Sequence, residues 1–205
     1  MGKIICLMGK SAAGKDTLYK RLLEDELLGL KAVIPYTTRP IREGEREGVE
    51  YFFTDEAFFR QMSDRGKIIE DRAYHTSQGL WRYFTADDGQ MSDREQNYIV
   101  IGTLEAYSRL QDYFGRDRLI PVMIELEDGV RLHRALERER SRKNPGYQEM
   151  CRRFLADCED FSEEKIAEAG VSKRFFNNNL DSCLEEIRSC IREAMEAGKS
   201  VGSGE

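Results

Sequence analysis

The sequence predicts an α/β fold: a three-layer parallel sheet wrapped by helices, with a small β-rich lobe and a helical lid. Two observations lead to this prediction. Short apolar segments typical of buried strands alternate with amphipathic segments of helical periodicity, as a parallel sheet covered by helices requires. Between residues 33 and 85 the alternation is interrupted by segments rich in strand formers and glycine, which indicates a separate β-rich unit.

The expected elements follow the chain in a clear order. Strands are expected at residues 3–8, 31–39, 49–53, 67–85 (two strands and a turn), 97–102, 119–126 and 173–179. Helices are expected at residues 15–28, 55–65, 103–113, 128–142, 148–169 and 180–197. The segment Asn144-Pro145-Gly146 separates the two long charged helices, because proline and glycine interrupt helical structure.

These elements divide the chain into four parts. The core comprises residues 1–32, 86–127 and 170–197, the β-rich lobe residues 33–85, the lid with its flanking helices residues 128–169, and a disordered tail residues 198–205. The tail, GKSVGSGE, has little apolar surface to bury, which is why disorder is expected there.

Composition limits the classes of function. A formal net charge of −6 over 205 residues argues against general binding of nucleic acid or anionic membranes. No segment approaches the length of an apolar membrane span, and the first residues resemble a strand rather than a secretion signal, so a cytoplasmic location is expected. The five cysteines form no CxxC pair and are expected to be small apolar core residues, not disulfides or metal ligands.

A phosphate-binding loop is predicted between the first strand and the first helix. Gly9 and Gly14 are five residues apart and Lys15 follows at once, which is the spacing GxxxxGK. Glycines allow the backbone N–H groups to turn toward an anion, and the helix N-terminus adds further donors. The residues expected at the nucleotide phosphates are Gly9, Ser11, Ala12, Ala13, Gly14, Lys15, Asp16 and Thr17.

One residue of the loop is unusual. Asp16 stands where such loops usually carry the Ser or Thr whose hydroxyl binds Mg²⁺, and Thr17 follows it. The carboxylate is a hard oxygen donor that could ligate Mg²⁺ directly or through water. It could equally serve to stabilise the helix N-terminus, where negative charge is favourable.

The β-rich segment carries a second set of motifs. YTTRPIR (36–42) is followed by GE (44–45), GVEY (48–51), a glutamate at position 70 and YFT (83–85). Together with the loop, these motifs resemble the guanylate kinases, whose monophosphate lobe carries TTRxxR, a GE turn and a G-x-x-Y step at this spacing. The resemblance covers nearly the whole chain. It implies a P-loop nucleoside monophosphate kinase that uses ATP and Mg²⁺ to phosphorylate GMP, or dGMP.

The resemblance also implies roles for the matching residues in the lobe. Arg39 and Arg42 would hold the phosphate of the acceptor, and Tyr51 and Tyr83 would donate hydroxyls to it, since arginine forks and phenols suit phosphate oxygens. Glu70 would accept hydrogen bonds from N1 and N2 of guanine. The full expected GMP-binding set is Arg39, Arg42, Tyr51, Glu70, Tyr83, Thr85 and Thr103.

Further positions are implied outside the lobe. Arg142 before the turn at 143–146 and Arg153 in the next helix match lid arginines that would close over the transferring phosphoryl group, with Arg138 as an alternative. The arginine-rich helix could also be a solvated face with Glu–Arg pairs. Asn177 would contact the adenine of ATP, although asparagine runs also form turns. The implied catalytic residues are Lys15, Arg39, Arg142 and Arg153, with Asp16 as a protein ligand of Mg²⁺.

Two departures affect the expected recognition of the base. Pro35 replaces the serine that the family places four residues before the first arginine. The family's D-x-D is missing near residues 101–103, where Thr103 remains as a polar group and Glu105 lies just beyond. Losing polar contacts weakens discrimination between bases, so base specificity stays open.

Other functions remain as alternatives. The GKD of the loop also resembles the ribose 1,5-bisphosphate phosphokinases, which lack the full TTRxxR and GxxY lobe. A non-catalytic guanylate-kinase-like module would bind phosphopeptides, but such modules usually lose the nucleotide loop. A GTPase switch would need an NKxD motif, which the chain lacks. The expected partners are ATP and a nucleoside monophosphate, with a monomer or homodimer and no nucleic acid or membrane.

Overall fold

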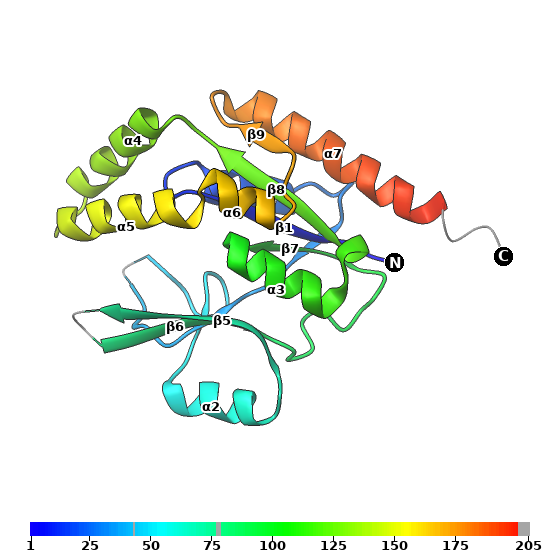
Figure 1. The fold of residues 1–205 in the computed structure, drawn as a ribbon, viewed down its shortest axis with the longest axis horizontal. Helices are drawn as coiled ribbons and strands as arrows, with labels where there is room; N and C mark the ends of the chain where they lie inside the picture. Colours follow the sequence, from blue (N-terminus) through cyan, green and yellow to red (C-terminus); the bar gives the residue numbers. More distant parts are fainter. Residues whose placement is uncertain (43, 77–78, 201–205) are drawn as a thin grey trace.

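The computed structural model describes residues 1–42, 44–76 and 79–200 of the chain. Its central sheet has five parallel strands in the order β2-β7-β1-β8-β9 (Figure 1). These strands are β1 (Ile4–Gly9), β2 (Leu30–Ala32), β7 (Asn97–Ile101), β8 (Leu119–Glu125) and β9 (Arg174–Phe176). The parallel sheet predicted from the alternating pattern is confirmed.

Both faces of this sheet are buried under helices. The covering helices are α1 (Lys15–Leu23), α3 (Leu104–Phe114) and α7 (Leu180–Ser200), with a short 3₁₀ helix η1 (Arg116–Arg118) before β8. Ile5 and Leu7 of β1 pack with residues of α1 and α7, whereas Ile4 and Met8 pack on the other face with residues of α3. Figure 1 shows α7 and α3 on opposite sides of the strands. A strand buried on both faces explains the continuous apolar run of β1.

A second sheet lies below the first in Figure 1, in the order β4-β3-β6-β5. It is built from β3 (Tyr36–Thr37), β4 (Phe52–Phe53), β5 (Ile68–Thr76) and β6 (Gly79–Ala86), with helix α2 (Glu56–Asp64) packed on it. Phe59 and Met62 of α2 form a small core with Phe84 and Ala86 of β6. Asp55 caps α2, because its carboxylate accepts a hydrogen bond from the backbone N–H of Phe58 at 2.8 Å.

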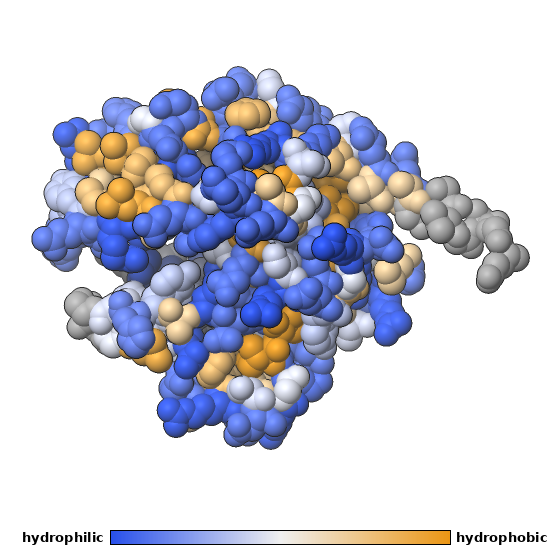
Figure 2. Space-filling view, in the orientation of Figure 1, coloured by the Kyte–Doolittle hydropathy of each residue, from blue (hydrophilic) through white to orange (hydrophobic). Residues whose placement is uncertain are grey.

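Three further helices follow strand β8 along the chain. They are α4 (Asp128–Arg140), α5 (Tyr147–Asp160) and α6 (Glu163–Glu168). In Figure 1, α4 and α5 lie side by side above the β5–β6 hairpin, and Figure 2 shows this face of the molecule hollowed between α5 and the hairpin. None of the helices in the described part of the chain is long and apolar enough to cross a bilayer.

Several predicted boundaries are wrong. The single helix expected at residues 148–169 is two helices, because Phe161 turns into the core and Ser162 caps α6 by accepting from the N–H of Lys165. The strand expected at residues 31–39 is divided between the two sheets. Helix α7 continues through Ser200, into the predicted disordered tail, since a helix anchored by packing extends at little cost. Residues 201–205 lie outside the described residues.

Two smaller expectations also need correction. The first helix ends at Leu23 rather than near residue 28, and the strand expected at 49–53 is reduced to Phe52–Phe53. The cysteines are free thiols, and Cys6 and Cys183 are buried as expected, but Cys151 is exposed on α5.

Candidate active site

The phosphate loop connects β1 to α1 at the carboxyl edge of the central sheet. Gly9 approaches β8 so closely that a Cβ there would lie 2.4 Å from the carbonyl oxygen of Ile124. Gly14 and Ala12 both have left-handed backbones, with φ of 93° and 64°. Gly14 is the N-cap of α1 and has no side chain to cap it, so the first N–H groups of the helix remain available to an anion.

The Lys15 side chain folds back over the loop that it follows. Its Nζ donates hydrogen bonds to the carbonyl oxygens of Gly9 at 2.5 Å and Lys10 at 3.0 Å. Burial lowers the pKa of Lys15 to about 8, against the carboxylates of Asp16 and Asp157, which raise it. The ammonium group is therefore held at the loop by weak acceptors that a phosphate could replace.

Asn177, the residue that follows β9, supports the loop. Its side chain is buried and donates a hydrogen bond from Nδ2 to the carbonyl oxygen of Ala13 at 2.8 Å. A Cβ on Gly14 would lie only 2.2 Å from the same nitrogen, so the loop and the asparagine fit closely. The predicted partner of Asn177 was the adenine of ATP. That contact stays a prediction; in the structure the amide nitrogen bonds to the loop backbone, and the residue is 3% exposed.

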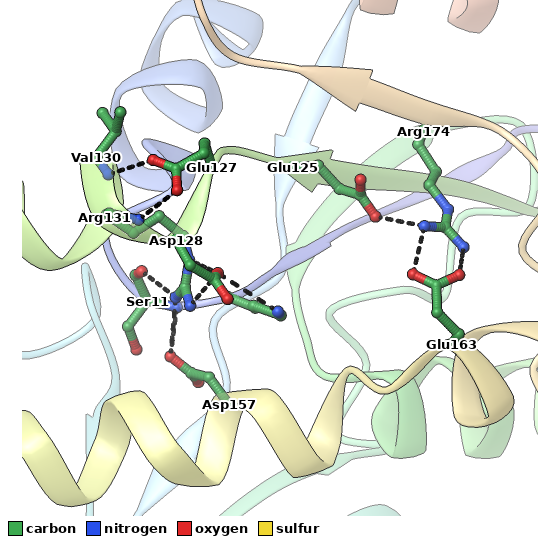
Figure 3. Close-up of polar contacts among 11 residues, drawn as sticks. Ser11, Glu125, Glu127, Asp128, Val130, Arg131, Asp157, Glu163 and Arg174 are labelled. Atoms are coloured by element: carbon green, nitrogen blue, oxygen red, sulfur yellow. Dashed lines mark hydrogen bonds and ion pairs between the residues drawn. The ribbon is translucent and has the colours of Figure 1, made fainter.

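The loop is also held from α4 and α5, at Ser11 (Figure 3). The Ser11 N–H donates to Oδ2 of Asp157 at 2.7 Å, and the Ser11 carbonyl accepts from Nη1 of Arg131 at 3.0 Å. Arg131 is fully buried, pairs with Asp128 at 2.7 Å and lies with its Cζ 4.6 Å from the centre of the Phe154 ring. The helices beside the loop thus fix both polar groups of the Ser11 backbone.

Arg131 and Asp157 were missed as site residues by sequence reasoning. Arg131 belongs to an arginine-rich helix, and such a charge pattern usually indicates a solvent-exposed face. Asp157 belongs to no recognisable motif. A contact across 120 or 146 residues leaves no trace in local spacing.

The predicted lid arginines gather near this loop. Arg153 donates from Nη2 to the hydroxyl of Ser11 at 3.0 Å. Arg142 is half-exposed and pairs with Glu139 at 2.8 Å. Burial and the guanidinium groups of Arg153 and Arg142 lower the pKa of Arg138, so the three cations lie close together, with Asp16 among the carboxylates that oppose the shift. The structure therefore brings Arg138 and both predicted lid arginines to one place.

On the second sheet, Arg39 lies in a cage of aromatic rings. Its guanidinium is buried, with Cζ 5.0 Å from the centre of the Tyr51 ring and 6.0 Å from that of Tyr83. Both terminal nitrogens pair with the carboxylate of Glu45, at 2.7 and 2.6 Å. Burial raises the pKa of Glu45, but hydrogen bonds from Arg39 and the backbone of Arg42 outweigh it and hold the pKa below its usual value.

Arg42 differs from Arg39 in its exposure to solvent. It is exposed, with its Cζ 5.9 Å from the centre of the Trp81 ring. A hydrogen bond from Arg152 lowers the pKa of Glu149 on α5, and the cations of Arg153 and Arg42 lower it further. Arg42 of the lobe therefore lies close enough to α5 for its charge to act on Glu149.

Three residues predicted to contact the base also come together. Glu70 is buried, and its Oε1 accepts from the hydroxyl of Thr85 at 2.8 Å. Its Oε2 accepts from Nε of Arg72 at 3.2 Å, and Nη1 of Arg72 reaches the hydroxyl of Thr103 at 3.4 Å. Sequence reasoning missed Arg72. The available signal was its position two residues after Glu70 on one strand, which places both side chains on the same face.

The fit of Mg²⁺ depends on Asp16. Within residues 1–42, 44–76 and 79–200, no group of three or more His, Cys, Asp or Glu side chains is arranged to hold a metal ion. Asp16 is an exposed carboxylate in the first turn of α1, next to Lys15. Mg²⁺ that arrives with a nucleotide needs one or two protein carboxylates, because phosphates and water supply the other ligands. The residues present fit that kind of metal binding.

A phosphate loop at the carboxyl edge of a parallel sheet, facing a second β-sheet that carries buried basic and aromatic side chains, defines the class of P-loop kinases. The family model for guanylate kinase matches residues 1–80. A guanylate kinase from Porphyromonas gingivalis is 27% identical over 195 residues, which are 94% of this chain and 98% of that protein. One from Mycoplasma mobile is 28% identical, covering 93% of this chain and 92% of the relative. Over most of its length this chain is therefore similar to guanylate kinases, and its loop carries the sequence GKD.

A solved structure agrees in fold. The chain aligns with a guanylate kinase from Anaplasma phagocytophilum at a TM-score of 0.62 and 19% identity, over 94% of this chain and 85% of that one. At this identity the likeness concerns the arrangement of strands and helices.

Proposed function

We propose that this chain transfers the terminal phosphoryl group of ATP to the phosphate of GMP or dGMP. The observation that carries the proposal is the presence of two separate sites suited to anions, one on each sheet. The Gly9–Lys15 loop offers backbone N–H groups and an ammonium, and Arg39 lies among phenol rings on the second sheet. A kinase of this family needs such a site for each of its two phosphorylated substrates.

In this proposal residues 33–85 form the acceptor lobe and residues 128–169 the lid with its flanking helices, whereas the remaining described residues form the core. Glu45 holds the Arg39 fork in one orientation, and the acceptor phosphate would share or replace that carboxylate. Tyr51 and Tyr83 would donate hydroxyls to the same phosphate. Arg42 is exposed and would complete the grip.

The chemical step would depend on position and charge. Lys15 would hold the outer phosphates of ATP, with Thr17 near the α-phosphate. Arg153, already bonded to Ser11, and Arg142 or Arg138 would neutralise charge on the transferring group and exclude water from it. The acceptor is a phosphate oxygen that is already anionic, so no general base is required.

Asp16 is the residue proposed to hold Mg²⁺, directly or through water. When bound, the ion supplies positive charge at the β- and γ-phosphate oxygens. Asn177 keeps a supporting part in the proposal, through its hydrogen bond to the loop carbonyl of Ala13.

A sugar-phosphate acceptor is the second candidate. The aspartate after the loop lysine favours it, because that sequence resembles the ribose 1,5-bisphosphate phosphokinases. The proposal for GMP has more support, since Glu70, Thr85 and Thr103 lie together where a base would need polar contacts.

The test is the release of ADP from ATP with GMP, dGMP, AMP, CMP, UMP or ribose 1,5-bisphosphate as acceptor. We expect turnover with GMP and dGMP, its loss in Lys15→Ala, and no change in Lys20→Ala, an exposed lysine on the same helix. Turnover with the sugar phosphate alone would overturn the proposed acceptor. No turnover with any acceptor would overturn the assignment as an enzyme and favour a binding module.

A further inference from the structure

Arg72 is a nearly buried cation in the acceptor lobe that the proposed function does not use. Its side chain is 16% exposed and that of Glu70 is 3% exposed. The two residues pair on strand β5 through Nε of Arg72 and Oε2 of Glu70, 3.2 Å apart. Burying a pair of charges is costly unless their remaining donors and acceptors are also satisfied. The remaining N–H donors of the Arg72 guanidinium therefore need hydrogen-bond acceptors.

The protein supplies acceptors for only some of these donors among the described residues. Nη1 is 3.4 Å from the hydroxyl oxygen of Thr103, beyond the usual range for such a bond. That oxygen already accepts from the N–H of Ala106 at 3.3 Å as the N-cap of α3. Within the described part of the chain, Nε and Nη1 are the atoms of Arg72 with recorded hydrogen bonds. Since a guanidinium has five N–H donors, several of them remain for a ligand.

These donors adjoin open space. A cleft of about 610 Å³ lies between β5, α3 and α6, and Arg72, Tyr74 and Thr103 are among the residues that line it. Glu70, which bonds to Arg72, also keeps acceptor capacity. A carboxylate has about four lone-pair positions, and Thr85 and Arg72 are the recorded donors to Glu70 among the described residues.

Glu70 and Arg72 together offer hydrogen-bond acceptors next to hydrogen-bond donors. Guanine presents N2–H and N1–H as donors and, next to them, O6 as an acceptor. A carboxylate suits the first two atoms, and a guanidinium suits O6 and its neighbour N7, which is the commonest arginine contact to guanine. Adenine reverses this order, with an acceptor at N1 and a donor at N6, so it would face both groups with the wrong atoms.

We propose that Arg72 determines base specificity by donating hydrogen bonds to O6 and N7 of guanine, while Glu70 accepts from N1 and N2. Arg72 thereby supplies a donor that Pro35, with no polar side-chain atom, cannot. This inference rests on the proposed function, because it takes a guanine nucleotide as the acceptor. The inference goes beyond the proposed function because it assigns the recognition of O6 to a residue outside the motifs of the lobe.

The test uses equilibrium binding, which does not depend on turnover. Calorimetry measures the Kd of GMP and of 6-thio-GMP, in which sulfur, a weak acceptor, replaces O6 while N1–H and the 2-amino group remain. The wild-type chain should prefer GMP. Arg72→Ala should weaken GMP about 10- to 100-fold, as for loss of a charged hydrogen bond, and should remove most of the preference over 6-thio-GMP.

Two further variants separate recognition from folding. Arg72→Lys keeps the charge beside Glu70 but loses the planar fork, so it should fold normally and still lose part of the preference for GMP. Arg60→Ala, at a 73% exposed arginine on α2, should bind both nucleotides as the wild type does. Thermal unfolding of each variant gives the check on folding.

The outcomes distinguish this inference from the proposed function. GMP binding with a preference that depends on Arg72 but without phosphoryl transfer would support the inference and contradict the enzyme proposal. Phosphoryl transfer to GMP, with the preference of Arg72→Ala for GMP over 6-thio-GMP unchanged from the wild type, would support the enzyme proposal and contradict the inference. An equal weakening of both nucleotides would show that Arg72 only supports Glu70, and this result or the absence of GMP binding to the wild type would overturn the inference.

Discussion

The contact between Arg131 and the phosphate loop allows a quantitative prediction. Replacing Arg131 with Met removes a guanidinium that is 1% exposed and leaves three oxygen partners behind. Asp128 is 50% exposed, so water can hydrate its carboxylate at little cost. Asp157 is 17% exposed and would keep the N–H of Ser11 but lose the guanidinium 3.7 Å away, and the Ser11 carbonyl would lose its donor.

A carboxylate that has lost its ion pair and a carbonyl that has lost its donor should together destabilise the fold by about 3 kcal/mol. For a domain of this size, that loss corresponds to a decrease in Tm of about 6–12 °C. Differential scanning calorimetry measures it directly. The matched control is Arg140→Ala on the same helix, where the arginine is 61% exposed and pairs with Glu137. That change should alter Tm by less than about 2 °C, since exposed pairs contribute little.

A double variant tests the physical reason. Arg131→Met combined with Asp157→Asn removes the uncompensated charge but keeps an oxygen that can accept from the Ser11 N–H. It should therefore recover at least half of the lost Tm, because neutral partners are far less costly to bury than unpaired charges. A single variant within about 2 °C of the wild type, or a double variant no better than the single one, would refute the reasoning.

Three further predictions concern the substrates. Burial lowers the pKa of Lys15 to about 8, so the lysine loses its charge as pH rises through that value. The affinity for ATP should therefore fall by up to about tenfold per pH unit above it. An ATP affinity that stays constant from about pH 6.5 to 9.5 would contradict this prediction. Glu45→Gln weakens the orientation of the Arg39 fork, so it should raise the KM for GMP about tenfold and leave the KM for ATP unchanged in steady-state assays. Asp16→Thr restores the usual hydroxyl and should retain or improve ATP affinity, whereas a collapse of Mg²⁺-dependent turnover would mean that the carboxylate is a required ligand.

The central fold was predictable because its signals are local. Alternating side chains of β1 must pack against two layers, and an apolar strand followed by a glycine loop and a helix leaves few arrangements of the chain. The division at Ser162 was not predictable in the same way. The helix ends there because Phe161 packs into the core formed by distant segments, and the charge pattern around it continues without interruption.

The sequence by itself determined the phosphate loop and the order of the acceptor motifs, because their chemistry depends on spacing along the chain. Only the tertiary structure decided the partners of the charged and polar side chains. Arg131 and Arg72 could have been fully solvated, yet Arg131 bonds to Ser11 and Arg72 reaches Thr103, while the amide of Asn177 bonds to Ala13. The physical reason is that burial raises the cost of an unpaired polar group, so its role depends on neighbours brought close by folding.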